Sequence, residues 1–232
     1  MNVRESGRIK WGRAAAALRA RPLMDRELPA FETGAAPERP GELFVDWLER
    51  AGQADVLDAG AVVLSTVDTD GVPDARVVAL RDVELGGGGW VFATDAESPK
   101  GTHLGERPVA AMTFYWPAQG RQVRVRGAVE PAPASVSAAE FLARSPASRV
   151  ASLVGRQSER LDSWAEYDEA ARAAEEQLAA NADAVPPGHT VYVLWADEVE
   201  FWQGARDRRH VRLRYTRALG PDETWTRSLL WP

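Results

Sequence analysis

Five short runs of β-branched and aromatic residues follow one another between residues 61 and 131, and they constrain the fold more than any other feature. The runs are AVVLSTVD (61–68), DARVVALRDVEL (74–85), GGWVFATD (88–95), PVAAMTFYW (108–116) and RQVRVRGAVEP (121–131). DTDG and LGGGG separate the first three, as is typical of hairpin turns. SPKGTHLGE predicts one short helix before the fourth run. Five strands so closely spaced predict an antiparallel barrel.

Helical periodicity flanks this block of strands. Apolar residues at helical spacing in PGELFVDWLERAGQA (40–54) predict an amphipathic helix. Later, SVSAAEFLARS and SWAEYDEAARAAEEQLAAN predict two more helices, the second opened by a capping box. A Pro-Pro-Gly break (186–188) ends this region, and TVYVLWADEVEFWQG, HVRLRYTRAL and TWTRSLLW predict strands. We expect an N-terminal arm (1–40) and one α+β domain (41–232) with a helical insert at about 134–184.

Composition excludes several classes of protein and site. The chain has no cysteine, which excludes disulfide scaffolds, thiolate metal sites and Cys nucleophiles. Its three histidines are far apart in sequence, so no metal site is expected. The net charge of −6 argues against nucleic acid as the main partner, because phosphate-backbone binding needs a basic footprint. No apolar run reaches the ~20 residues that span a bilayer, and the Arg-rich start lacks a leader-type cleavage site. We expect a soluble, cytoplasmic protein with no membrane partner.

The residues that could carry chemistry are basic and polar side chains at strand ends and turns. Phosphate-loop, dinucleotide, nucleophile-elbow and zinc motifs are missing from the sequence. Arg76 lies within a predicted strand, where a rim charge and a functional cation are about equally common. Lys100 stands at a predicted helix entry, where backbone N–H groups favour phosphate. Gln157 and Ser158 offer hydrogen bonds from a turn between helices. Each of these signals is weak alone.

The stretch EFWQGARDRRH (200–210) gathers Arg and His directly behind an aromatic strand. It is either a solvated hairpin tip or a site that holds an anion against a flat ring. With the R-V-V-x-L strand, VFATDAESPKG, RQVRVRG and GRQSERL in this order, EFWQG…R.H.R.RY resembles the pyridoxamine 5′-phosphate oxidase family. The resemblance runs from about residue 40 to the C-terminus. It implies an antiparallel Greek-key split β-barrel with flanking helices, FMN as cofactor, and a homodimer with flavin sites at the subunit interface.

The resemblance also implies which residues contact the flavin. Arg76 and Lys100 match the positions that bind the FMN phosphate, and Trp202 matches an aromatic placed near the flavin. The implied cofactor-binding set is Arg76, Val77, Val78, Ala79, Leu80, Arg81, Thr94, Lys100, Gln122, Gln157, Ser158, Trp202 and Arg212. Arg208 and His210 match the pair that faces the substrate over the flavin ring. These two are the catalytic candidates, as groups that orient the substrate and stabilise charge.

The substrate side departs from the family pattern. Members that form pyridoxal phosphate hold the substrate phosphate with Lys, Tyr, Arg and Ser, and those positions here read Arg81, Glu140, Arg144 and Ser148. Arg208, Arg209 and His210 complete the implied substrate-binding set. Glu140 would repel a dianion, unless Phe141 takes that position. At flavin positions Ala93 replaces a Tyr and Pro99 an Arg, and the arm lacks the family's Arg-x-x-Tyr lid.

FATDAESPKG, FYW and RQSE are similar to a sister branch of the family, the flavin oxidases of phenazine biosynthesis (dihydrophenazinedicarboxylate synthase type). We therefore expect an FMN-dependent oxidase that moves hydride from a reduced ring, or from an amine or alcohol carbon, to flavin. O₂ is the expected acceptor and H₂O₂ the product. The alternatives are a pyridoxine/pyridoxamine 5′-phosphate oxidase and a non-catalytic flavin-binding protein. The retained Arg208 and His210 argue against the last, and the sequence does not name the substrate.

Overall fold

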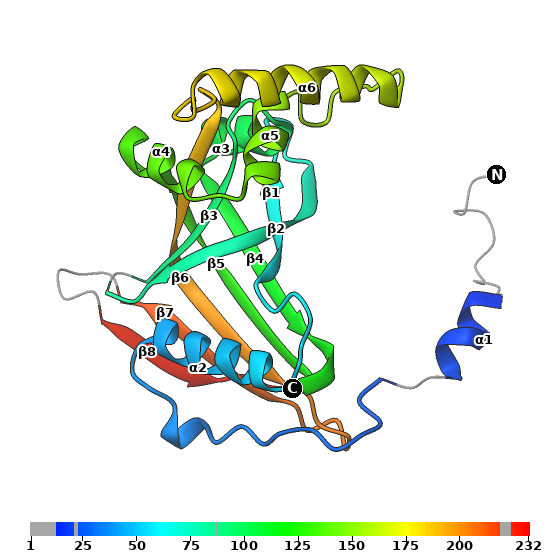
Figure 1. The fold of residues 1–232 in the computed structure, drawn as a ribbon. Coiled ribbons are helices and arrows are strands. Elements are labelled where there is room, and N and C mark those ends of the chain that lie inside the picture. The colour runs from blue at the N-terminus through cyan, green and yellow to red at the C-terminus, as the bar shows by residue number, and fades with distance from the viewer. Residues whose placement is uncertain (1–12, 21–22, 87, 219–223) are drawn as a thin grey trace.

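The computed structural model describes residues 13–20, 23–86, 88–218 and 224–232, and these form one antiparallel sheet of eight strands. The strands are β1 (Ala61–Val67), β2 (Pro73–Glu84), β3 (Gly89–Asp95), β4 (Val109–Trp116), β5 (Arg121–Pro131), β6 (His189–Gln203), β7 (Val211–Arg217) and β8 (Trp225–Leu229). Their order is β3-β2-β1-β4-β5-β6-β7-β8, and a β3–β6 pairing closes β1 to β6 into a barrel (Figure 1). The predicted split barrel with flanking helices is confirmed.

Side-chain alternation fills the barrel, because successive residues of a strand point to opposite faces. On β4, Met112, Phe114 and Trp116 are buried, whereas Tyr115 between them is exposed. Trp90 and Phe92 on β3 are fully buried by the same rule. Burying an aromatic or aliphatic side chain of this size contributes about 1.5–3 kcal/mol. The barrel is therefore a rigid frame that fixes where each strand ends.

Helix α2 (Pro40–Gln53) closes one end of the barrel, as its apolar spacing predicts (Figure 1). Pro40 starts the helix at its first position, where the missing N–H costs nothing. Phe44 packs edge-on against Phe114 with ring centroids 4.7 Å apart, and Trp47 packs against Phe201 at 5.2 Å. These contacts anchor the chain that precedes β1.

Four further helices gather at the other end of the barrel (Figure 1). They are α3 (Pro99–Glu106), α4 (Ala134–Leu142), α5 (Pro146–Val154) and α6 (Trp164–Ala180). One half of the predicted capping box is present at the start of α6, where the Ser163 hydroxyl accepts a hydrogen bond from the N–H of Glu166 at 3.3 Å, whereas the Glu166 carboxylate accepts from the N–H of Asp162 at 3.4 Å. Helix α5 lies in a stretch for which the sequence predicts no helix. The first turn of α3, helix α5 and the turn that follows α5 face β2 and the C-terminal end of β3.

The N-terminal arm crosses the end of the barrel that α2 covers. Helix α1 (Arg13–Arg19) buries no residue, whereas the segment 24–37, here called the strap, packs on the barrel. Met24 is buried, and the Tyr215 hydroxyl donates to the carbonyl of Pro37 at 2.8 Å. Residues 1–12 and 21–22 of the expected arm, and Leu219 of the strand expected at 210–219, lie outside the described residues. Across the helices of the described part, none has the length and apolar content of a membrane span.

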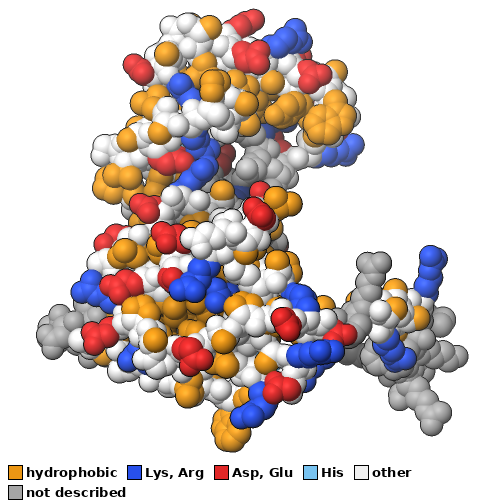
Figure 2. Space-filling model, turned by 60° about the horizontal axis from the view of Figure 1, so that its bottom comes forward, with side chains coloured by type: hydrophobic (Ala, Val, Ile, Leu, Met, Phe, Trp, Pro, Cys, Tyr) orange, Lys and Arg blue, Asp and Glu red, His pale blue; other side chains and the backbone are white. Residues whose placement is uncertain are grey.

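Acidic and basic side chains are interspersed over the face drawn in the space-filling view, with hydrophobic side chains between them (Figure 2). Some of the exposed apolar side chains stand on the outer faces of barrel strands: Val63 on β1, Val77 on β2, and Val109 and Tyr115 on β4. An apolar outer face of this kind is a surface on which another protein chain can pack.

Candidate functional site

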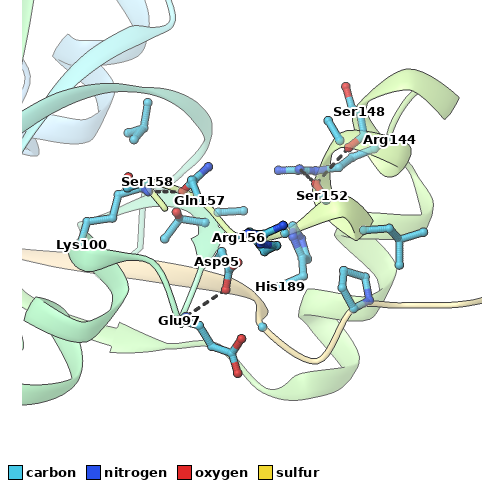
Figure 3. A pocket seen from close by; sticks show the side chains of 18 of the residues that line it. Asp95, Glu97, Lys100, Arg144, Ser148, Ser152, Arg156, Gln157, Ser158 and His189 are labelled. Carbon is cyan, nitrogen blue, oxygen red and sulfur yellow. Dashed lines mark hydrogen bonds between the residues drawn. The ribbon is translucent and has the colours of Figure 1, made fainter. Parts of the chain in front are cut away.

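A cavity of about 690 Å³ opens where β2, β3, α3 and α5 approach one another. Its lining includes ten of the predicted site residues: Arg76, Val77, Val78, Ala79, Thr94, Lys100, Arg144, Ser148, Gln157 and Ser158. Lys100, Gln157 and Ser158 lie on one side of the cavity, and Arg144 and Ser148 lie on the other (Figure 3). Folding thus brings together predicted residues as far apart in the sequence as Arg76 and Ser158, which are 82 positions apart. Of the predicted cofactor set, Leu80 packs instead against the barrel core.

Two cations share the first side of this cavity. The Arg76 guanidinium donates to the Leu64 carbonyl at 3.1 Å and to the Thr66 hydroxyl at 2.8 Å, which holds it at the end of β1. Lys100, in the first turn of α3, is only 9% exposed. Burial lowers the pKa of Lys100, and the nearby charge of Arg76 lowers it further, against the opposing pull of Asp95. Two like charges held together in a cavity cost free energy unless an anion joins them.

The turn 155–158 faces the Lys100 ammonium from the α5 side. The Lys100 ammonium donates to the Gln157 side-chain oxygen and to the Ser98 hydroxyl, the latter at 3.1 Å. Arg156 and Ser158 adopt left-handed backbone angles, with φ of 53° and 73°, which non-glycine residues rarely do. Backbone strain of this kind concentrates at ligand sites, where the surrounding structure holds it in place. The turn therefore forms a second polar wall of the cavity, next to Lys100.

A charged cluster lies beside the other side of the cavity. Glu140 on α4 forms a two-oxygen contact with the Arg144 Nε at 3.1 and 3.0 Å, and it pairs with the Arg81 Nε at 3.0 Å. His189, at the start of β6, contacts the second Glu140 oxygen through Nε2 at 2.7 Å. Phe141 instead is fully buried, with its ring 5.3 Å from that of His189. Glu140, rather than Phe141, is therefore the side chain that meets the two arginines.

The pKa values in this cluster favour an ionised Glu140 and a neutral His189. Partial burial opposes ionisation of Glu140, but hydrogen bonds from Arg144 and His189 outweigh it, so the pKa of Glu140 is lowered. Burial lowers the pKa of His189, and the positive charge of Arg144 adds to this, although Glu140 opposes both. A neutral His189 that donates its Nε2 hydrogen fits both directions. One carboxylate, two guanidinium groups and a neutral imidazole leave a net charge of +1.

These shifts predict that the protein loses stability as the pH falls below about 6.5, the ordinary pKa of histidine. The pKa of His189 is lower in the folded state than in the unfolded state, so the unfolded chain takes up a proton first. His189→Gln keeps an N–H donor but cannot titrate. We expect its melting temperature to fall less steeply than that of the wild type between pH 6.5 and 5, measured by circular dichroism. Parallel melting curves for the two proteins would contradict the prediction.

A second cluster of predicted residues lies at the far end of β6. Gln122, Trp202 and Arg212 are direct cross-strand neighbours on β5, β6 and β7. Neighbours in register share a face, and these three are half-exposed while the flanking Phe201 is buried, so they line the outer surface of the barrel. The His210 ring packs against Trp202 with centroids 4.8 Å apart. Arg208 and Arg209 stand in the exposed loop before β7.

The two clusters cannot serve one ligand within a single chain. His189 borders the cavity at the first residue of β6, and Trp202 follows thirteen residues later on the same strand. A strand rises about 3.3 Å per residue, which separates the two clusters by roughly 40 Å. The structure therefore brings the predicted residues together in two groups at opposite ends of one strand.

Several residues of the cavity carry no signal in the sequence. His189 and Ser152 line it, and Ser152 accepts a hydrogen bond from Arg144 at 3.0 Å. Asp74, which is not part of the lining, pairs with Arg76 at 2.6 Å. A lone histidine after a Pro-Pro-Gly break is typical of a surface turn, but His189 is buried and contacts Glu140, which lies 49 positions away in the sequence. No local pattern could have found it.

Comparison with known proteins matches most of the chain. Residues 48–163 match the family model described as pyridoxamine 5′-phosphate oxidase, and residues 189–232 match the pyridoxine 5′-phosphate oxidase C-terminal dimerisation region. The pyridoxine/pyridoxamine 5′-phosphate oxidase of Hyphomonas neptunium is 38% identical over 204 residues, which cover 84% of this chain and 88% of the relative. The enzyme of the same name from Caulobacter vibrioides is 38% identical over 197 residues, covering 84% and 86%.

Solved structures resemble the fold as well. PhzG from Burkholderia lata 383, in complex with tetrahydrophenazine-1-carboxylic acid, superposes with a TM-score of 0.77 and 31% identity, covering 88% of this chain and 99% of PhzG. A pyridoxamine 5′-phosphate oxidase-related, FMN-binding protein from Nostoc punctiforme superposes with a TM-score of 0.68 at 17% identity, covering 83% and 97%. The second likeness concerns the fold alone.

Proposed function

The chain belongs to the pyridoxamine 5′-phosphate oxidase family of FMN-dependent oxidoreductases, and we propose that it is a homodimeric oxidase of phenazine-type specialised metabolism. The observation that carries this proposal is the position of Glu140, which engages both Arg81 and Arg144. When bound, FMN supplies a two-electron acceptor for a reduced ring of the substrate, and O₂ takes the electrons onward to give H₂O₂.

The cavity residues Arg76, Lys100, Gln157 and Ser158 fit the phosphate end of FMN. Arg76 and Lys100 are held close together in the cavity, and the lowered pKa of Lys100 reflects burial and this proximity. A phosphate monoester would meet both cations at the start of α3, where helix N–H groups also favour an anion. Gln157 and Ser158 would add hydrogen bonds from the strained turn. These four residues are our assignment for the phosphate site.

The second cluster fits the ring end of the flavin, contributed by the other subunit. Gln122, Trp202 and Arg212 lie roughly 40 Å from the cavity of their own chain, on the outer barrel surface. The match to the dimerisation region covers β6, β7 and β8. A two-fold dimer would place the second cluster of one chain against the cavity of its partner. Each flavin would then be held by both chains.

The roles of the remaining residues follow from their charge and position. Arg208 and His210, beside Trp202, would orient the substrate over the flavin ring and stabilise negative charge that develops there. A guanidinium offers a carboxylate a two-point contact. No side-chain nucleophile is required. The barrel and the strained loops hold these groups in place before the substrate arrives.

The Glu140 cluster supports a substrate that carries a carboxylate rather than a phosphate. Its net charge of +1 suits a monoanion, whereas a phosphate dianion would meet a carboxylate already seated on both arginines. The like-charge contact works against such a ligand. PhzG of Burkholderia lata, 31% identical, was solved with tetrahydrophenazine-1-carboxylic acid. A reduced aromatic carboxylate is therefore the substrate class that we propose.

Formation of pyridoxal 5′-phosphate is the second candidate function. Relatives at 38% identity bear the name pyridoxine/pyridoxamine 5′-phosphate oxidase, and this chain keeps Arg144 and Ser148 at the cavity. Under this alternative a substrate phosphate would have to displace Glu140 from the arginines. A third candidate, a flavin-binding protein without turnover, leaves Arg208 and His210 with no role.

The purified yellow protein can be tested with three compounds. We expect tetrahydrophenazine-1-carboxylic acid to bleach the flavin without O₂ and to release H₂O₂ in air, faster than pyridoxine 5′-phosphate or pyridoxamine 5′-phosphate does. Faster turnover of the two phosphates would establish the second candidate. Binding of FMN with no bleaching by any of the three would favour the third.

A shared site also predicts that flavin binding and dimerisation are linked, because a ligand that binds only the dimer stabilises it by mass action. On serial dilution we expect FMN release and dimer dissociation to occur over the same concentration range. Flavin fluorescence reports release, and analytical ultracentrifugation reports mass. A monomer that keeps its FMN would contradict the shared site.

A further inference from the structure

The loop between β6 and β7 is anchored at its base. The Gly204 N–H donates to the Gly120 carbonyl at 2.7 Å, and the buried Gln203 amide donates to the Gln119 carbonyl at 3.0 Å. A side-chain atom on Gly204 would lie only 2.8 Å from the Met24 sulfur, so the strap packs directly on the loop. Hydrogen bonds and packing against the strap therefore hold the start of the loop that carries Arg208 and His210.

The peptide groups of Ala205 contact both catalytic candidates. The Ala205 N–H donates to the His210 Nδ1 at 3.0 Å, and the Ala205 carbonyl accepts from the Arg208 N–H at 3.1 Å. The turn holds Arg208 at a φ of 68°, in the left-handed region. One residue thus contacts both the backbone of Arg208 and the ring of His210.

The direction of the first bond decides where His210 carries its hydrogen. A backbone N–H can only donate, so the His210 Nδ1 must accept with a lone pair. In a neutral imidazole whose Nδ1 accepts, the single ring hydrogen resides on Nε2. The Trp202 ring beside His210 further limits how the imidazole can turn.

We propose that the Ala205 N–H holds His210 in the Nε2–H tautomer, so that His210 meets the substrate as a hydrogen-bond donor and not as a proton-accepting base. Removing a proton through Nε2 requires a lone pair there, and this tautomer has none. An oxygen of the substrate, in a carboxylate or ring carbonyl, is the group that Nε2–H would bind. The assignment of that partner rests on the proposed function, whereas the tautomer itself does not.

The tautomer can be read directly in the FMN-loaded protein without substrate. The chain has three histidines, so selective ¹⁵N-histidine labelling gives three ring systems, and His210→Gln identifies the signals of His210. At a pH well above 6.5, the ordinary pKa of histidine, a long-range ¹H–¹⁵N correlation spectrum should show hydrogen on the His210 Nε2 and a bare Nδ1. Hydrogen on Nδ1 overturns the proposal.

Ala205→Pro removes the N–H that the proposal depends on, and Ala205→Ser keeps it. We expect the serine variant to show the wild-type His210 spectrum and the proline variant to show hydrogen shared between the two ring nitrogens. The flavin absorption spectrum shows that both variants are folded and loaded. An unchanged tautomer in a loaded proline variant would overturn the assigned cause.

The donor role is tested by two substitutions of similar size. His210→Gln offers an N–H donor, whereas His210→Glu offers only acceptors when ionised. With tetrahydrophenazine-1-carboxylic acid and pyridoxine 5′-phosphate as probes, we expect flavin reduction by the glutamate variant to be at least about tenfold slower than by the glutamine variant, a loss in the range of one charge-assisted hydrogen bond. A glutamate variant as fast as or faster than the glutamine variant would show that His210 acts as a base. Because the spectrum needs no substrate, a wrong substrate class leaves the test of the tautomer intact.

Discussion

Replacing Lys100 with methionine is expected to weaken FMN binding on the order of a hundredfold. Methionine keeps the length and apolar stem of lysine but removes the charge. Lys100 is buried beside Arg76 in the cavity, so a phosphate bound there would be paired with little screening by water. Truncating one partner of such a buried charge pair costs about 2–5 kcal/mol, and each 1.4 kcal/mol is a factor of ten. Fluorescence titration of the flavin-free protein with FMN measures the change.

Arg172→Met is the matched control, because it also removes one positive charge but from the exposed face of α6. Its FMN affinity should stay within about twofold of the wild type, as expected for a surface charge outside a site. The flavin-free Lys100→Met protein should melt no lower than the wild type, since burial and Arg76 both disfavour the ammonium. Undiminished FMN affinity would remove Lys100 from the phosphate site.

Glu140→Tyr is expected to raise kcat/KM for pyridoxine 5′-phosphate by at least about tenfold. In the wild type Glu140 forms ion pairs with both Arg81 and Arg144, so the substitution frees two guanidinium groups for a phosphate. It also removes the negative charge of Glu140. At about 4 Å and an effective dielectric of about 20, repulsion by such a charge raises the free energy of binding a dianion by on the order of 4 kcal/mol per unit of ligand charge. The arginines already offset part of that cost, so we expect about 1.4 kcal/mol as the minimum gain.

Glu140→Gln separates charge from shape, because it removes the negative charge but keeps the side-chain length. If charge is the cause, glutamine should give most of the gain of tyrosine, and the FMN affinity of both variants should match the wild type. The His189 Nε2 loses its ionised partner in both variants, so some loss of thermal stability is expected as well. A wild type that already oxidises pyridoxine 5′-phosphate efficiently, with no response to either change, would remove the main support for a carboxylate substrate.

The barrel could be predicted from the sequence because its signals are local. Each of the runs 61–68, 74–85 and 108–116 has its own alternation and its own turns, and the observed strands differ from them by a residue or so at each end. Helix α5 was missed although Ala147, Val150, Ala151 and Val154 recur at helical spacing, because it is only nine residues long. Its capping Ser145 and its Pro146 at the first position were further signals.

The site could be predicted only in its parts. The resemblance singled out Arg76, Lys100 and Glu140, but it carried no information about what Glu140 contacts. That environment arises from β2, α4 and β6, whose residues meet only when the barrel closes. The separation of Trp202 from the cavity likewise depends on the length of β6, which a list of matched positions does not convey.

The two ends of β6 have a genetic consequence. If each site takes its cavity from one chain and its ring-end residues from the other, a defect at Lys100 and a defect at Arg212 damage different halves of the same site. Co-expressed chains that each carry one of these defects would assemble some mixed dimers. In those dimers both defects fall in one site, and the other site is intact. Two alleles that are each inactive alone can therefore restore activity when they are expressed together. The dimer, rather than the single chain, is the unit whose activity such mutations change.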